Sequence, residues 1–291
     1  MPIVPGMPRP TPEQLASLRG FERVAFALAD TMNRRPALKR AGHAFLRSVG
    51  ATWVHVCSRN LQTVWGLEDL RALRPERGLI IAANHTSFFD CYVIASVLLR
   101  NTDWVERMYF PVKSTYFYER LDGVLVNALM SAMAMYPPVM REPHQRELNK
   151  HSVDYLVYVL GQRGTVVGIH PEGTRNKTGD PYTLLPAQPG IGQIAYHARA
   201  EVLPVFVLGL SNDFARQVRS NFARDPAKRG APITMVFGRP VALDAFYGQA
   251  PRLRTYMGIA RHVRDEITKL GADERRRRVA AGMPVDGPSG G

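Results

Sequence analysis

The sequence is poor in cysteine and begins without a long apolar run. Its two cysteines, Cys57 and Cys91, have neither metal-site nor disulfide spacing, so we expect two reduced thiols packed as small apolar side chains. The first twenty residues contain five prolines and no continuous apolar segment, which argues against a secretory signal peptide. These absences lead us to expect a cytoplasmic protein.

The sequence pattern also lacks a convincing membrane-spanning helix. The best candidate, residues 123–139, is interrupted by Asn127 and Ser131 and ends in two prolines. It is also shorter than the roughly 20 apolar residues that cross a bilayer. Any contact with a membrane is therefore expected at its surface, on the inner face of the cell membrane.

Acidic residues are missing between Asp30 and Glu68, and the whole chain has a net charge of +13. Such a charge favours a polyanionic partner, either an anionic membrane or a nucleic acid. Because no recognition-helix or RNP-type motif is present, we expect the membrane surface and no nucleic acid. A second basic run, residues 275–278, lies near the C-terminus. The basic residues of the first stretch are Arg34, Arg35, Lys39, Arg40, Arg47 and Arg59.

The 291 residues, 45% of them hydrophobic, can bury one sizeable core. We expect one α/β domain at 51–279, preceded by a helical extension at 1–50 and followed by a Gly/Pro-rich, disordered tail at 280–291. Apolar residues recur at helical spacing in 13–32 and 36–49, which predicts a helical hairpin. The hairpin either packs on the domain or lies in the membrane interface with its basic face on lipid phosphates.

Short apolar runs alternate with helical segments along the domain. This alternation predicts a mainly parallel central sheet flanked by helices on both faces. The expected strands are 78–83, 108–112, 164–169, 202–208 and 232–237, and the expected helices are 88–100, 114–135, 144–162 and 189–199.

The segment from Asn84 to Asp90, Asn-His-Thr-Ser-Phe-Phe-Asp, follows a predicted buried strand. His85 in the loop and Asp90 in the first helical turn can meet at the carboxyl edge of the sheet, where open α/β folds place their sites. A carboxylate that accepts the proton of one imidazole nitrogen leaves the other nitrogen as a base. His85 would then deprotonate an acceptor hydroxyl, which attacks a thioester directly. The plain alternative is a loop histidine beside an ordinary helix N-terminal acid.

A second polar segment, His-Pro-Glu-Gly-Thr-Arg at residues 170–175, follows another predicted buried strand. Gly173 permits close backbone approach to a ligand, and Arg175 can hold a phosphate with a bidentate fork. Glu172 can either order the loop or bind a polar acceptor group. Taken alone, this segment is also compatible with a surface turn.

Together the two segments resemble the glycerolipid acyltransferase family, the 1-acylglycerol-3-phosphate acyltransferases and their relatives. The first family motif, Asn-His-x-Ser-x-x-Asp, matches residues 84–90. The third, usually Phe-Pro-Glu-Gly-Thr-Arg, matches residues 171–175, and a weaker fourth motif of apolar residues around a proline matches 202–206. The resemblance covers about residues 55–240.

The resemblance implies an O-acyltransferase in which His85 is the general base and Asp90 orients it. It implies acyl-CoA or acyl-carrier protein as donor, no metal and no organic cofactor. The expected reaction acylates the free hydroxyl of a lysophospholipid, chiefly 1-acylglycerol-3-phosphate, to give phosphatidic acid. The acceptor-binding residues that the resemblance implies are Lys113, Arg141, Glu172, Gly173, Thr174 and Arg175.

Two departures from the family pattern leave the acceptor open. The second motif, normally Gly-x-Ile-Phe-Ile-Asp-Arg, corresponds to Tyr-Pro-Pro-Val-Met-Arg at 136–141, where Arg141 is the counterpart of the family arginine. Another acceptor, such as a lyso-ornithine lipid, a glycolipid or glycerol-3-phosphate, therefore remains an alternative. His170 replaces the usual Phe, either as a tolerated histidine or as one that tunes the acceptor pocket.

Functions of other classes also fit parts of the sequence. A metal-dependent hydrolase could use His85, Asp90, His170 and Glu172 as ligands. A serine hydrolase could use Ser87, although this serine lies in no Gly-x-Ser-x-Gly elbow. A non-catalytic basic protein that binds membranes would account for the charge but for neither polar segment.

Overall fold

A computed structural model of the protein describes residues 6–225 and 228–285. Its centre is a six-stranded sheet in the order β1-β8-β7-β2-β6-β3. Strands β3, β6, β2 and β7 run parallel, β8 is antiparallel to β7, and β1 is parallel to β8, so the predicted mainly parallel sheet is confirmed. The strands are β1 (Gln62–Trp65), β2 (Leu79–Ala83), β3 (Arg107–Tyr109), β6 (Thr165–Ile169), β7 (Glu201–Leu208) and β8 (Ile233–Phe237).

All five strands expected from the sequence are present. Every residue of β2 and of β8 is buried, because helices cover both faces of the sheet. The sequence pattern missed only β1 in this sheet. That edge strand is half-buried along its whole length and lacks the continuous apolar run that marks the central strands.

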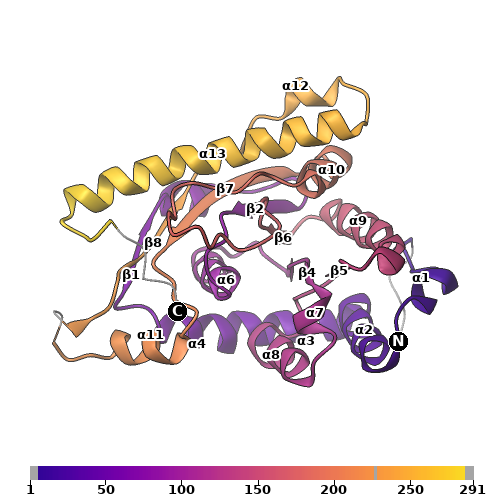
Figure 1. The fold of residues 1–291 in the computed structure, drawn as a ribbon, viewed down its shortest axis with the longest axis horizontal. Helices are drawn as coiled ribbons and strands as arrows, with labels where there is room; N and C mark the ends of the chain where they lie inside the picture. Colours follow the sequence, from indigo (N-terminus) through magenta and orange to yellow (C-terminus); the bar gives the residue numbers. More distant parts are fainter. Residues whose placement is uncertain (1–5, 226–227, 286–291) are drawn as a thin grey trace.

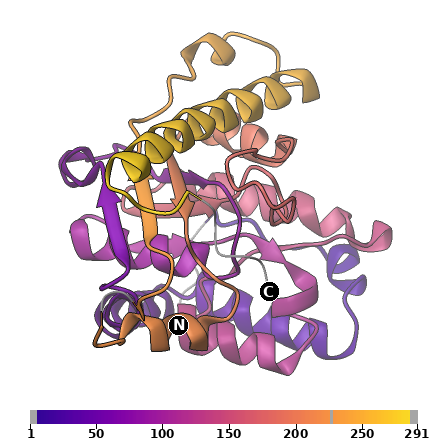
Figure 2. The same ribbon diagram turned by 60° about the vertical axis from the view of Figure 1, so that its left-hand side comes forward.

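Helices form a layer on each side of the sheet (Figures 1 and 2). One layer contains α9 (Glu147–Leu160), α10 (Pro189–Ala198) and α13 (Leu253–Ala280), and the other is built around α6 (Asp90–Asn101). The long helix α13 was not expected from the sequence. Its buried residues Ile259, Val263, Ile267 and Gly271 recur every fourth position, a signal that its many arginines obscure.

The N-terminal helices are α1 (Pro12–Ala16), α2 (Gly20–Arg34) and α3 (Pro36–Phe45). Helix α3 continues through a π-helical turn, η1 (Leu46–Gly50), into α4 (Ala51–Val56), so the predicted domain boundary at residue 50 lies inside a continuous helical segment. In Figure 1 α2 is seen nearly end-on whereas α3 lies across the view. The two consecutive helices that the sequence predicted are present, and they meet at an angle.

The remaining elements lie in the connections. The helix predicted at 114–135 is divided into α7 and α8, and it ends where Ala132 and Met133 adopt positive φ. These elements are β4 (Val112–Lys113), α7 (Ser114–Phe117), α8 (Leu121–Ser131), β5 (Pro138–Val139), η2 (Pro143–Gln145), α5 (Leu67–Ala72), α11 (Phe214–Asn221) and α12 (Asp244–Tyr247).

Two of the basic residues assigned to a lipid-facing surface are buried. Arg34 pairs with Asp30 at 2.6 Å, and its exposed fraction is 4%. The Lys39 ammonium donates to Met108 O at 2.6 Å and lies over the ring of Tyr109. Both cations therefore join the N-terminal helices to the domain, and the prediction that they contact lipid phosphates is wrong. Burying a charged group costs free energy, and hydrogen bonds or ion pairs with internal partners offset that cost.

The second basic run is also partly internal. Arg278 is fully buried, where it pairs with Glu274 at 2.6 Å and donates to Pro284 O at 3.0 Å. Residues 286–291, half of the predicted tail, lie outside the described residues. Across 6–225 and 228–285, no helix is both long and apolar enough to span a bilayer.

Candidate active site

Two loops meet at the carboxyl edge of the sheet because their strands are neighbours. Strands β2 and β6 run parallel, with Ala82 opposite Ile169, so the loops that follow them start side by side. Asn84, the first residue after β2, donates its side-chain amide to Val207 O and accepts from Val207 N. These two hydrogen bonds extend the contact between β2 and β7 by one residue. They therefore fix the point at which the loop after β2 begins.

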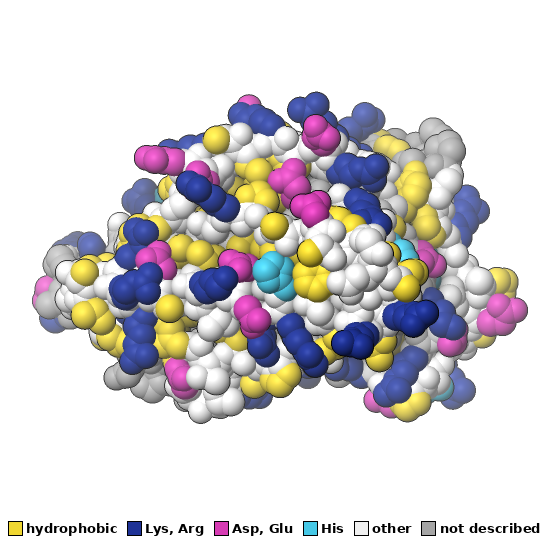
Figure 3. Space-filling model, turned by 90° about the horizontal axis from the view of Figure 1, so that it is seen from above, with side chains coloured by type: hydrophobic (Ala, Val, Ile, Leu, Met, Phe, Trp, Pro, Cys, Tyr) yellow, Lys and Arg dark blue, Asp and Glu magenta, His cyan; other side chains and the backbone are white. Residues whose placement is uncertain are grey.

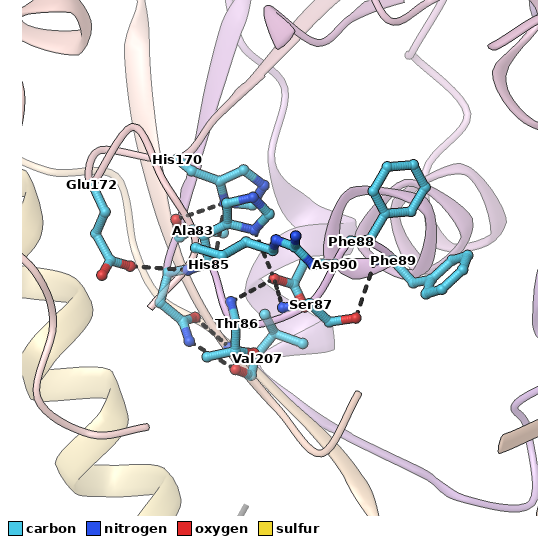
Figure 4. A network of polar contacts seen from close by, with 12 residues as sticks. Ala83, His85, Thr86, Ser87, Phe88, Phe89, Asp90, His170, Glu172 and Val207 are labelled. Carbon is cyan, nitrogen blue, oxygen red and sulfur yellow. Dashed lines mark hydrogen bonds and ion pairs between the residues drawn. The ribbon is translucent and has the colours of Figure 1, made fainter. Parts of the chain in front are cut away.

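The first loop brings His85 and Asp90 together (Figure 4). His85 Nδ1 lies 3.0 Å from Asp90 Oδ2, and this oxygen also accepts the backbone N–H groups of Thr86 and Ser87 at 2.8 Å. Helix α6 starts at Asp90, so the loop folds back over its first turn. Because a carboxylate oxygen only accepts, Nδ1 carries the proton and Nε2 is left with a lone pair.

Burial shapes the charge of this dyad. Asp90 is fully buried and the His85 side chain is 21% exposed. Burial raises the pKa of Asp90 to about 6. Burial, with the positive charges of Arg175 and Lys113 behind it, lowers the pKa of His85 to about 3. The resting pair is therefore an aspartate beside a neutral imidazole, which is the state a general base requires.

Glu172 joins the two loops. Its buried carboxylate accepts from His85 N at 2.9 Å through Oε1 and from Leu185 N at 2.8 Å through Oε2. Both oxygens thus already bind backbone N–H groups. The structure places Glu172 as an organiser of the His85 loop, which is the first of the two roles that the sequence left open.

His170 occupies the place of the family Phe and lies directly against His85. The two imidazole rings are stacked, with centroids 4.0 Å apart and planes 7° apart. His170 Nδ1 lies 3.0 Å from both Ala83 O and Asn84 O. Figure 4 shows His170 over the His85 ring. Because carbonyl oxygens only accept, Nδ1 of His170 also carries its proton.

Basic side chains gather beside the dyad. Strand β4 pairs with β5, Lys113 opposite Val139, and so carries Lys113 toward Arg141. Lys113 donates to Thr174 Oγ1 at 3.1 Å, and Arg141 donates to Gly173 O at 2.7 Å.

Positive charges surround Lys113 within this group. Burial lowers its pKa, and so do the nearby charges of Arg141, Arg175 and Lys177. Gly173 has a φ of 65°, which favours glycine and keeps this turn free of a side chain. The structure thus brings the predicted binding residues together, and Lys177 is an addition that the sequence reading missed.

A family model described as Acyltransferase matches residues 62–208, about half of the chain. The chain belongs to the acyltransferase family. It is also similar to a solved structure, that of the 1-acyl-sn-glycerophosphate (LPA) acyltransferase PlsC from Thermotoga maritima. That likeness has 18% identity and a TM-score of 0.45, and it covers 86% of this chain and 87% of the other. No curated protein matches the chain.

The loop after β7 adds a residue to the site of this acyltransferase. Asn212 accepts from Arg175 Nη1 at 2.8 Å and from Phe88 N at 3.0 Å through the same oxygen. It therefore ties the second loop to the start of α6. The sequence reading missed Asn212, although its position just past a buried strand, at the same sheet edge, is the signal that could have found it.

The structure bears on two alternative chemistries. Ser87 is fully buried, and its hydroxyl donates to Ser211 O at 3.2 Å, so it is not presented as a nucleophile. In the described part of the chain, no three His, Cys, Asp or Glu side chains are grouped as metal ligands would be. The polar atoms of Glu172 and the Nδ1 atoms of both histidines already have protein partners.

Proposed function

We propose that this acyltransferase moves a fatty acyl group from a thioester, acyl-CoA or acyl-carrier protein, to the free hydroxyl of a lysophospholipid. The first candidate acceptor is 1-acylglycerol-3-phosphate, which would give phosphatidic acid. The observation that carries the proposal is the 3.0 Å contact of His85 with Asp90 beside a group of basic side chains. Membership of the acyltransferase family supports the reaction class.

The chemistry follows from the free nitrogen of His85. Its Nε2 takes the proton of the acceptor hydroxyl while the oxygen attacks the thioester carbonyl carbon. The C–S bond then breaks, and the departing thiolate takes the proton back from the imidazolium. Asp90 holds the tautomer and stabilises the transient positive ring. Neither a covalent enzyme intermediate nor a second base is required for the atoms to balance.

A phosphate on the acceptor fits the basic group. Three basic side chains, Arg141, Arg175 and Lys113, donate hydrogen bonds to neutral oxygens. Among the described residues, no carboxylate forms an ion pair with any of them. Arginine forks suit phosphate oxygens. Replacing Arg141 and Arg175 together by Ala is expected to raise the acceptor KM about 10- to 100-fold, roughly 1.4 to 2.7 kcal/mol. An unchanged KM would refute this phosphate clamp.

The same cations discriminate between acceptors. A lyso-ornithine lipid or an uncharged glycolipid offers no phosphate to them, so product analysis with mixed acceptors separates these two alternatives from the proposed acceptor. We expect mass spectrometry to find the acylated phosphate monoester as the main product. Preferential acylation of an acceptor without phosphate would redirect the proposal to the other members of the family.

An apolar surface supports membrane docking. Helices α2, α3, α4, α8 and α11 lie along the lower edge in Figure 1, opposite α13. The α13 side, viewed in Figure 3, instead mixes Lys and Arg with Asp and Glu. Exposed apolar side chains on the lower helices include Val24, Leu28, Val49, Trp53, Leu121, Leu125 and Leu129. We therefore propose peripheral binding to the inner face of the cell membrane through this surface, the apolar face.

A small apolar cavity of about 10 Å³ lies between α4, α6 and α8. Val54 of α4 and Met130 of α8 line this cavity from one side, and Cys91, the neighbour of Asp90, lines it from α6. Met130 and Met135 also line this cavity, and methionine side chains adapt readily to apolar neighbours.

The deciding experiment measures release of the donor thiol with anionic liposomes that contain lysophosphatidic acid. Wild type is expected to release thiol only when acceptor is present, and His85→Ala to be slower by about 10² to 10⁴. His262→Ala, on α13, is the control that should match wild type. Equal slow release by wild type and His85→Ala would overturn the proposal.

Membrane docking has its own test. Replacing Leu121, Leu125 and Leu129 together by Gln should reduce liposome sedimentation strongly, since α8 loses its exposed apolar stripe. The matched control changes Leu253 and Val279 of α13, which are equally exposed on the opposite layer, to Gln. Equal sedimentation of both variants would remove the apolar face as the docking surface.

A further inference from the structure

His170 departs from the family residue, and its ring is stacked directly on the ring of His85. It follows β6 directly, yet its Nδ1 reaches back to the two carbonyl groups at the end of β2, Ala83 O and Asn84 O. A donor held by two oxygens on a neighbouring strand has little freedom to rotate. The plane of the His170 ring is therefore fixed by the sheet itself.

His85, by contrast, is held only at one edge of its ring. Asp90 Oδ2 accepts from Nδ1, but a single hydrogen bond leaves a histidine ring free to tilt about its broad second side-chain torsion. The His170 ring is stacked on the His85 ring, 4.0 Å away and within 7° of parallel, and so prevents it from tilting toward that side. The stacked ring therefore restrains the plane in which His85 Nε2 lies.

The electrostatic state of His170 suits this role. Burial and the adjacent His85 lower its pKa to about 4, so it stays neutral when the dyad works. An aromatic face carries partial negative charge, and a neutral ring therefore tolerates the imidazolium that forms on His85 during transfer. A second positive ring at 4.0 Å would oppose it.

We propose that His170 is a positioning residue, whose fixed aromatic ring holds the imidazole of His85 in its reactive orientation through stacking. This inference rests on the proposed acyl transfer. It assigns no proton transfer to His170, because its Nδ1 proton is committed to two backbone carbonyls. A phenylalanine, the usual residue here, would supply the same flat surface without those bonds.

The test compares His170→Phe, His170→Leu and His170→Ala with wild type and the remote control His262→Ala. We expect Ala to lower kcat at least tenfold with both KM values within twofold, because misplacing a catalytic group weakens the chemical step more than binding. Phe should restore kcat to within about threefold of wild type, and Leu, which fills the volume without a flat face, should fall between the two. Thermal unfolding checks that each variant folds.

The outcomes separate this inference from the proposed function. If wild type transfers no acyl group, the proposed function fails. If wild type is active and His170→Ala has normal kcat, or if only the acceptor KM rises, the positioning role is overturned. If His170→Ala does not fold, the comparison of Phe with Leu decides, since equal kcat in these two would show that a flat ring is not needed.

Discussion

The loops after β2 and β6 each place a histidine at the same edge of the sheet, and each histidine donates its Nδ1 proton to oxygen. The partners differ. His85 donates to the buried carboxylate of Asp90, whereas His170 donates to the neutral carbonyls of Ala83 and Asn84. A carboxylate stabilises a positive imidazolium, but carbonyl groups mainly fix the position of a neutral ring. In the proposed acyl transfer, the same side chain is a base in one loop and a support in the other.

The largest effect is expected when this difference is removed. Asp90→Asn replaces the carboxylate by an amide that no longer fixes the Nδ1–H tautomer of His85, and loss of an orienting aspartate typically lowers kcat by about 10³ to 10⁴. Steady-state kinetics measures the change. Asp122→Asn, an exposed carboxylate at the start of α8, is the control and should retain wild-type kcat. If kcat of Asp90→Asn falls by less than tenfold, the carboxylate of Asp90 does not give His85 a role different from that of His170.

Glu172→Gln acts on the link between the loops. The carboxylate accepts hydrogen bonds from two backbone N–H groups, those of His85 and Leu185. The amide of glutamine has only one oxygen, so one of these two N–H groups faces the amide NH₂ group and loses its acceptor. Leaving a buried donor unsatisfied costs about 1–3 kcal/mol, so denaturant unfolding should show that loss of stability together with a roughly tenfold lower kcat. Exposed Glu142→Gln should change neither. Unchanged unfolding would indicate that the loops are held together without this carboxylate.

The pH dependence distinguishes the carboxylate from the imidazoles. Asp90 accepts a proton as the pH falls through about 6 and then no longer orders the His85 tautomer, whereas the lowered pKa of His85, about 3, leaves that ring neutral there. We expect kcat/KM at pH 5 to be about one tenth of its value at pH 7.5. This acid limb should vanish from the residual activity of Asp90→Asn. Its persistence there would assign the titration to another group.

The smallest effect is expected at the third loop. Asn212→Ala removes the oxygen that Arg175 and Phe88 N share, so the acceptor KM should rise about threefold while kcat stays near wild type. Asn101→Ala removes an equivalent Asn–Arg contact, to Arg71, far from the site and should leave both constants unchanged. A fall in kcat alone would place Asn212 closer to the chemistry than to acceptor binding.

Much of the fold could be predicted because its central strands are buried on both faces. Continuous apolar runs such as β2 and β7 are visible without any tertiary information. Edge strand β1 and helix α13 were missed, since half-buried or arginine-rich segments show weak periodicity.

The site divides in the same way. The proximity of His85 and Asp90 could be predicted, since His85 lies in a short loop after a strand and Asp90 begins the helix that follows this loop. The stacking of His170 on His85 depends on which strands are neighbours, and adjacency of β2 and β6 is not written in either segment. Asn212 was missed for the same reason, because it reaches the site from β7.

The amino-acid sequence by itself determined which residues could do acid–base chemistry and that they would end buried parallel strands. Only the tertiary structure decided which partners each of those residues contacts. Arg34 and Lys39 show the reason most clearly: they read as surface charges, yet packing surrounds them with Asp30 and Met108 O and turns them into internal contacts. Charge and motif are local properties of a chain, whereas burial and partners come from segments far apart in it.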